Sequence, residues 1–168
     1  MSAKRKIGVL ISGRGSNLQA LIEASRNADY PGEIVLVLSN VADAKGLERA
    51  RAASNPTVVI DHSRYASGEG FDQAMDIRLS EPGVDFVCLA GSMRILSDGF
   101  VRRWQGRMIN IHPSLLPAFG GPGMYGQRVH EAVLASGSKV SGASVHLVTP
   151  EYDRGPVIAQ RTVPVEPG

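Results

Sequence analysis

Short apolar runs alternate with amphipathic stretches along most of this chain, and that alternation limits the fold more than any other feature. The first run, residues 7–11, contains no polar side chain, which is typical of a strand buried on both faces of a parallel sheet. Strands separated by helices form right-handed βαβ units. The sequence therefore predicts an α/β fold with a mainly parallel sheet.

The same pattern places the individual elements. Strands are expected at residues 7–11, 34–38, 57–60, 86–90 and 108–112, followed by more alternating, partly exposed strands at 140–148 and 157–165. Ser16 is expected to cap a first helix with Leu18, Leu21 and Ile22 on one face. Further helices are expected at 46–53, 71–79, 97–104 and 129–134. In a doubly wound sheet, ligands bind at the carboxyl ends of the strands, so the loops that follow strands are the candidate sites.

Length and charge exclude several classes of protein. The 168 residues fit one domain, residues 1–168, and 18 basic against 16 acidic residues give no strong field for nucleic acid or an anionic membrane. The single cysteine, Cys88, lies in an apolar run, so we expect a buried, inert thiol and neither a disulfide nor a cysteine-based zinc site. The apolar stretch that ends at Ile11 is too short for a signal peptide, which favours a reduced, cytoplasmic protein.

A glycine-containing loop, residues 12–18, joins the first strand to the first helix. Glycines permit a tight turn there, and the N–H groups at the start of a helix favour an anion. The loop lacks the third glycine of a dinucleotide fingerprint, because that position is Leu18, and it lacks the lysine of a Walker motif. It therefore indicates a phosphomonoester site, or else only a turn between a strand and a helix.

Asn110 and His112 are two residues apart on a predicted strand that Pro113 ends, so their side chains share a face at its carboxyl end. A carboxamide can hold an oxyanion and an imidazole can move protons, which together suit acyl transfer. A structural role for both remains the alternative. His146, on a later strand, is expected to be structural. No pair among His62, His130 and His146 has a zincin-like spacing, so no metal site is expected.

An acidic loop, residues 151–156, separates the last two predicted strands. Its Asp153 fits an ordinary turn residue. If the fold brought this carboxylate beside His112, it would instead favour the charged imidazolium. Spacing alone does not decide between the two.

Four segments occur together in one order: Ile-Ser-Gly-Arg-Gly-Ser-Asn-Leu-Gln at 11–19, Leu-Ala-Gly-Ser-Met-Arg-Ile-Leu at 89–96, Asn-Ile-His-Pro-Ser-Leu-Leu-Pro at 110–117 and Asp-Arg-Gly-Pro at 153–156. Together they resemble the folate-dependent formyltransferases over essentially the whole chain. The His-Pro-Ser-Leu-Leu-Pro segment is shared across that superfamily. The Gly-Ser-Asn-Leu-Gln loop narrows the resemblance to the phosphoribosylglycinamide formyltransferase (GAR transformylase) family.

This resemblance implies a Rossmann-like three-layer fold with a twisted sheet. It also implies transfer of the formyl group of 10-formyltetrahydrofolate to the amine of 5'-phosphoribosylglycinamide (GAR) in de novo purine (IMP) biosynthesis, by direct amine attack through a tetrahedral intermediate. The implied catalytic set is Asn110, His112 and Asp153, with no metal, and the implied phosphate-binding residues are Gly15, Ser16 and Asn17. Folate binding is implied for Met93, Arg94, Ile95, Leu96, Asn110, Thr149, Pro150, Glu151, Tyr152 and Asp153.

The sequence departs from the family pattern at three places. Residues 118–126 form a longer loop than in the best-known members, and Ser92 replaces a common Phe beside the expected folate stretch. The chain ends at Gly168, where the family would enter its C-terminal helical segment, so we expect the domain to lack that segment and the Glu in it that contacts substrate.

Three other functions share parts of this pattern. A methionyl-tRNA formyltransferase would normally add a basic C-terminal domain, and a formyltetrahydrofolate hydrolase would add an N-terminal regulatory domain. A non-catalytic phosphate-binding module would need only the glycine loop. The presence of Asn110, His112 and Asp153 together argues against the last of these.

Overall fold

The computed structural model describes residues 3–92 and 96–166 and divides into two compact units, Met1–Met108 and Ile109–Gly168. Its strands form one seven-stranded sheet in the order β3-β2-β1-β4-β5-β6-β7. The pairs formed by β1 to β4 are parallel, and those formed by β6 with β5 and β7 are antiparallel. The predicted α/β class with a mainly parallel sheet is confirmed.

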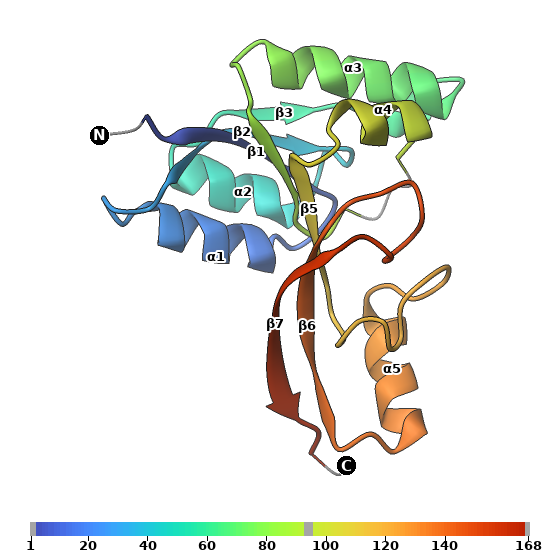
Figure 1. Cartoon of the computed structure of the whole chain (residues 1–168). Helices are drawn as coiled ribbons and strands as arrows, with labels where there is room; N and C mark the ends of the chain where they lie inside the picture. The colour runs from blue at the N-terminus through green and yellow to red at the C-terminus, as the bar shows by residue number, and fades with distance from the viewer. Residues whose placement is uncertain (1–2, 93–95, 167–168) are drawn as a thin grey trace. The chain divides into compact units, whose positions relative to one another are not determined.

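The first unit is a three-layer arrangement around four parallel strands: β1 (Arg5–Ile11), β2 (Gly32–Ser39), β3 (Thr57–Val59) and β4 (Phe86–Leu89). Figure 1 shows one pair of helices on one side of these strands, α1 (Ser16–Ser25) and α2 (Lys45–Ala52). On the other side lie α3 (Gly68–Ser80) and α4 (Asp98–Arg103). A single 3-10 turn, η1 (His62–Arg64), follows β3.

Strand β1 is buried on both faces, as its unbroken apolar sequence predicts. Val9, Leu10 and Ile11 are at most 2% exposed. Burying such a side chain stabilises the folded state by about 1.5–3 kcal/mol. Gly8 allows α3 to approach, because a Cβ atom there would lie 2.7 Å from Leu79. This packing fixes the carboxyl end of β1, from which the glycine loop starts.

Cys88 is buried in β4, which confirms the predicted environment of the thiol. Burial disfavours the thiolate and raises the pKa of Cys88 to about 11. A thiol with so high a pKa is a poor nucleophile at neutral pH. Cys88 is therefore a packing residue of the sheet.

Buried carboxylates on α3 hold α4 in place. Asp76 accepts a hydrogen bond of 3.1 Å from the Trp104 indole N–H and forms an ion pair of 2.9 Å with Arg103. Asp72 accepts the backbone N–H of Ser97, and the Ser97 hydroxyl in turn caps α4. These contacts anchor the chain immediately after the expected folate stretch, because Ser97 directly follows Leu96.

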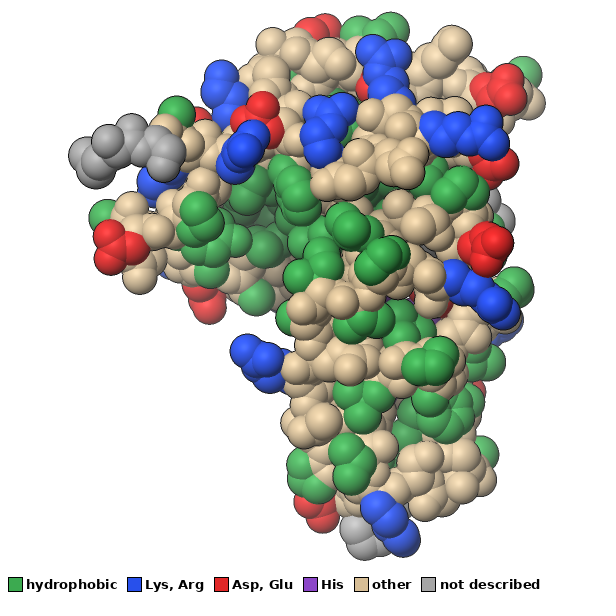
Figure 2. Space-filling view, in the orientation of Figure 1, with side chains coloured by type: hydrophobic (Ala, Val, Ile, Leu, Met, Phe, Trp, Pro, Cys, Tyr) green, Lys and Arg blue, Asp and Glu red, His purple; other side chains and the backbone are tan. Residues whose placement is uncertain are grey.

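The second unit is built on antiparallel strands. β5 (Met108–His112) begins at the last residue of the first unit, and β6 (Val140–Leu147) and β7 (Val157–Pro164) follow α5 (Gln127–Ser136). Every residue of β7 is exposed. The exposed large hydrophobic residues of β6 and β7 are Val140, Val157, Ile158 and Val163, and Figure 2 shows hydrophobic side chains on the surface of this part of the chain. The second unit thus has a thinner core than the first.

A buried serine on β6 fixes the turn that follows β5. The Ser144 hydroxyl donates to the Ser114 carbonyl at 2.7 Å and accepts the Leu116 N–H at 3.0 Å. The Gln160 side chain donates to the same hydroxyl at 2.9 Å and to the Leu116 carbonyl at 3.1 Å. The backbone after His112 is therefore held by side chains from β6 and β7.

The structure corrects the predicted cap of the first helix. Ser16 is the first helical residue and Gly15 is the N-cap, with no side-chain cap. Gly15 replaces Ser16 in this position because the backbone turns through a left-handed conformation there, with φ of 77°. The bounds of the other elements agree with the prediction to within a few residues at each end. The largest difference is at the start of α3, which begins at Gly68 instead of residue 71 because Ser67 caps it. Within residues 3–92 and 96–166, none of the helices combines the length and apolarity needed to cross a bilayer.

Candidate active site

The glycine loop is shaped by close packing against α2. A Cβ atom on Gly15 would lie 2.6 Å from the Gly46 Cα atom, and the Gly46 N–H donates to the Gly13 carbonyl at 2.9 Å. The Arg49 guanidinium donates to the Arg14 carbonyl at 2.8 Å. Ser16 and Asn17 stay exposed at the start of α1. The loop is thus a fixed backbone turn that presents the first N–H groups of a helix to solvent, a geometry suited to an anion.

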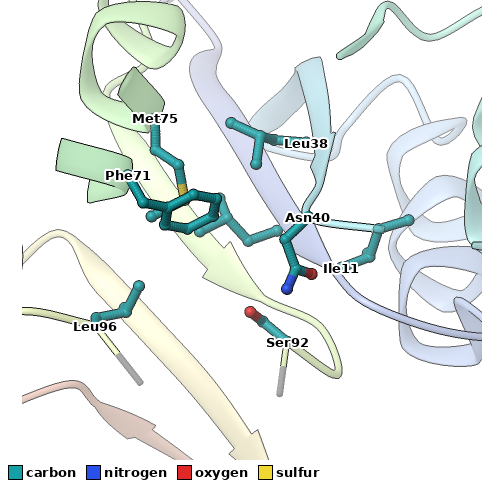
Figure 3. A pocket seen from close by; sticks show the side chains of 8 residues that line it. Ile11, Leu38, Asn40, Phe71, Met75, Ser92 and Leu96 are labelled. Atoms are coloured by element: carbon teal, nitrogen blue, oxygen red, sulfur yellow. The ribbon is translucent and has the colours of Figure 1, made fainter. Parts of the chain in front are cut away.

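A small cavity of about 10 Å³ lies near the carboxyl ends of β1 and β2 (Figure 3). It has room for the centre of about one water molecule, which is too little for a phosphate or a pterin. Figure 3 shows apolar side chains around most of it and Asn40 and Ser92 turned toward one another at its polar edge. The residues that line it are Leu10, Ile11, Leu38, Asn40, Phe71, Met75, Ser92 and Leu96.

His112 is the centre of a buried polar cluster in the second unit. The residue is 3% exposed. Its Nδ1 atom lies 3.5 Å from Oδ1 of Asp153, and its Nε2 atom lies 2.8 Å from the Phe119 carbonyl oxygen. Both neighbours can only accept a hydrogen bond, so a doubly protonated imidazole would meet an acceptor at each ring nitrogen. The arrangement suits a proton donor at the end of β5.

The loop between β6 and β7 brings Asp153 back to this position. Asp153 has a left-handed backbone, with φ of 54°, and its Oδ2 accepts the Gly121 N–H at 2.9 Å. Gly155 lets the loop fold back on β6, because a Cβ atom there would lie 1.7 Å from the Leu147 carbonyl oxygen. The Leu147 N–H then bonds the Pro156 carbonyl at 2.9 Å. The proximity of Asp153 to His112, which spacing left undecided, is a property of this loop.

His146 also belongs to the cluster, although the sequence favoured a purely structural role for it. The residue is 3% exposed, and its Nε2 atom lies 3.7 Å from Oδ1 of Asp153 and 3.2 Å from Nδ2 of Asn110. The sequence signal for this grouping is the two-residue alternation of side chains along each strand. Asn110 pairs with His146 and His112 with Ser144 across the antiparallel ladder, so the four side chains share a face.

The remaining predicted site residues divide between the two units. Leu96 is half-buried in the first unit, and Met93, Arg94 and Ile95 lie outside the described residues. In the second unit, Thr149 donates to the Glu151 carbonyl at 3.2 Å in the same loop as Asp153. Pro150 and Glu151 are exposed, and so is Tyr152, at 46%.

The other two histidines have different surroundings. His62, in η1, contacts Asn40 in the first unit, and His130 is exposed on α5. Among the residues that the structure describes, no group of three or more His, Cys, Asp or Glu side chains could hold a metal ion.

Comparisons of this chain with family models, curated proteins and solved structures all indicate the same family. The formyl transferase family matches residues 5–168. The human trifunctional purine biosynthetic protein adenosine-3 is 48% identical over 165 residues, which are 98% of this chain and 16% of that protein. The chain thus spans about one sixth of the length of the trifunctional relatives that it matches.

Shorter relatives are covered more fully. The phosphoribosylglycinamide formyltransferase of Escherichia coli K12 is 48% identical over 162 residues, which are 96% of this chain and 74% of the relative. The crystal structure of glycinamide ribonucleotide transformylase 1 from Symbiobacterium toebii superposes with a TM-score of 0.92 at 44% identity, over 99% of this chain and 76% of that one. The chain therefore belongs to the formyl transferases, and among them to the phosphoribosylglycinamide formyltransferase family.

Proposed function

We propose that this chain transfers the formyl group of 10-formyltetrahydrofolate to the amine of GAR, a step in purine biosynthesis. Family membership supports the reaction class. The single observation that carries the proposal is the cluster of buried His112 with half-buried Asn110 and Asp153, which combines an imidazole, a carboxamide and a carboxylate within one compact unit. Formyl transfer needs such a set, because negative charge develops on the formyl oxygen while a proton moves between two nitrogens.

The glycine loop supplies the site for the phosphate of GAR. Gly15 holds the turn, while Ser16 and Asn17 are exposed at the start of α1. Backbone N–H groups at a helix start attract a phosphate through hydrogen bonds and the helix dipole. Since α2 fixes the shape of the loop, these donors are already in place before the substrate arrives.

We assign folate binding to the stretch 93–96 and to the loop that contains Thr149, Pro150, Glu151, Tyr152 and Asp153, with Asn110 beside it. The cluster fits this co-substrate, because its polar groups include N–H donors and an imidazole that can hold a proton. When bound, the folate supplies a formyl group whose carbon the GAR amine attacks. The chain supplies the surroundings: Asn110 donates a hydrogen bond to the developing negative charge, and the Nε2–H of His112 turns from the Phe119 carbonyl to the substrate and donates to it as well.

Asp153 acts on His112 rather than on the substrate. Its Oδ1 lies 3.5 Å from Nδ1 of His112, and its Oδ2 is held by the Gly121 N–H. The carboxylate therefore stabilises the charged imidazolium and orients the ring. His112, directly or through a bound water, moves the proton that the attacking amine must lose toward the folate nitrogen. No covalent enzyme intermediate is needed.

The test is the turnover of His112→Ala with both substrates at saturation. We expect kcat to fall about 10²–10³-fold, because such a donor stabilises the transition state by a few kcal/mol. His130→Ala, on the exposed face of α5, is the matched control and should leave kcat unchanged. A His112→Ala enzyme within a few-fold of the parent would refute the proposed role of His112.

The acceptor is tested in parallel. Formyl transfer to GAR is measured against transfer to methionyl-tRNA, with release of free formate as a control for hydrolysis. Transfer to GAR alone is the expected result. Transfer to tRNA or hydrolysis without transfer would replace the proposal by one of the other formyltransferase-like activities.

A further inference from the structure

His146 has more polar contacts than a buried structural histidine needs. Its side chain is 4% exposed and lies within 3.0 Å of the Leu147 carbonyl oxygen, 3.2 Å of Asn110 Nδ2 and 3.7 Å of Asp153 Oδ1. The cross-strand pairing of Asn110 with His146 places the two side chains on one face. This contact joins His146 to the residue that we assign as oxyanion donor.

The position of the proton on His146 follows from its neighbours. The Leu147 carbonyl oxygen near Nδ1 can only accept a hydrogen bond, so Nδ1 carries a hydrogen. In the neutral ring Nε2 is then an acceptor, and the nearest donor is the Asn110 amide nitrogen. The neutral Nδ1–H tautomer therefore satisfies both ring nitrogens within the cluster.

We propose that His146 is a positioning residue that fixes which end of the Asn110 carboxamide faces the reacting groups. An amide flip of Asn110 would set its carbonyl oxygen against the lone pair of Nε2, so the flipped orientation is disfavoured. One Asn110 N–H is used on His146, and the second keeps a fixed direction. This inference rests on the proposed function, because the direction of that N–H matters only if Asn110 binds the formyl oxygen.

The Nδ1–H tautomer favoured by these contacts also leaves Asp153 to pair with His112. His112 and His146 approach the same oxygen, Oδ1 of Asp153, at 3.5 Å and 3.7 Å. A second positive ring at that oxygen would compete with His112 for the carboxylate. In this tautomer His146 donates to the Leu147 carbonyl and accepts from Asn110, so it adds no positive charge beside Asp153.

The experiment compares two substitutions of His146. His146→Leu removes the acceptor and should lower kcat about 10–10²-fold, with each KM within about twofold, because misorienting a donor affects mainly the transition state. In His146→Gln the side-chain oxygen can accept the Asn110 N–H, so this variant should recover most of the lost kcat. Equal losses in the two variants, or no loss in His146→Leu, would overturn the proposal.

A double-mutant cycle shows whether His146 acts through Asn110. In an Asn110→Ala background, His146→Leu should lower kcat by less than twofold further, because the group it positions is already gone. If the two effects multiplied, His146 would have only a general structural role. The cycle includes thermal melts, so that loss of folded protein is separated from loss of kcat.

A measurement on the unmodified protein needs neither turnover nor variants. Long-range ¹⁵N spectra of histidine-labelled protein at neutral pH should show His146 protonated at Nδ1 and unprotonated at Nε2. The opposite tautomer would overturn the inference. The outcomes stay distinct: if His112→Ala kept full activity, the proposed function of the cluster would fail, while the spectrum would still decide the contact between His146 and Asn110.

Discussion

The glycine loop and the His112 cluster are two polar sites built in opposite ways. In the glycine loop, the proposed phosphate donors are backbone groups of consecutive residues, and side chains matter mainly where they must be absent, as at Gly15. In the cluster, side chains from β5, β6 and the loop after β6 meet in a buried place. We expect the glycine loop to tolerate changes in the polarity of its side chains but not an increase in their volume. The cluster should tolerate small changes of shape but not loss of a charge or a donor.

Of the variants that test this comparison, the one with the largest expected effect removes the negative charge from the cluster. Asp153→Asn should lower kcat about 10²-fold, because it removes the negative charge beside His112. Asn tolerates the left-handed backbone and can still accept the Gly121 N–H, so the loop should keep its shape. Steady-state rates with a melting curve measure this. A variant as active as the parent would show that the geometry of Asp153 matters and its charge does not.

The next effect tests the need for empty space in the loop. Gly15→Ala forces a Cβ atom to within 2.6 Å of the α2 backbone and strains a left-handed residue by about 1–2 kcal/mol. We expect KM for GAR to rise about tenfold as the phosphate donors shift. Gly13→Ala is the matched control, because nothing lies within 4 Å of its Cβ position. If both variants bound GAR equally well, the close packing on α2 would not shape the site.

The smallest effect concerns the support of the cluster. Ser144→Ala leaves the Leu116 N–H and the Ser114 carbonyl without their buried partner, which costs about 1–3 kcal/mol of unfolding free energy. Ser141→Ala, near the start of the same strand, is the control. Urea denaturation followed by circular dichroism compares the two. Equal midpoints would mean that water replaces the Ser144 hydroxyl and that the turn after His112 does not depend on it.

Much of the first unit could be predicted because its signals are local. A continuous apolar run such as residues 7–11 indicates a buried strand by itself, and the glycines of the next loop indicate a turn. The predicted N-cap of α1 is wrong because the position of Gly15 depends on its contact with α2, which the local sequence does not show.

The second unit was harder to predict because its signals are distant. Asn110 and His112 could be found from their spacing, but the approach of Asp153 depends on Gly155 folding the loop back on β6. The sequence predicts only a structural role for His146 because its partner, Asn110, lies 36 residues earlier in the chain. Only the antiparallel pairing of β5 with β6 connects them, and strand pairing is poorly determined by a single sequence.

The register of that ladder has a consequence for how the chain can change in length. Pairing of Asn110 with His146 is set by the strands, so the connection between β5 and β6 does not need a fixed number of residues. The first part of that connection is held at Ser114 and Leu116 by side chains of β6 and β7. It is held again at the Phe119 carbonyl and the Gly121 N–H by the cluster. Insertions after Gly121 and before α5 would leave these contacts intact. The part of the 118–126 loop that follows Gly121 is therefore a region where new sequence can be introduced without moving the polar cluster.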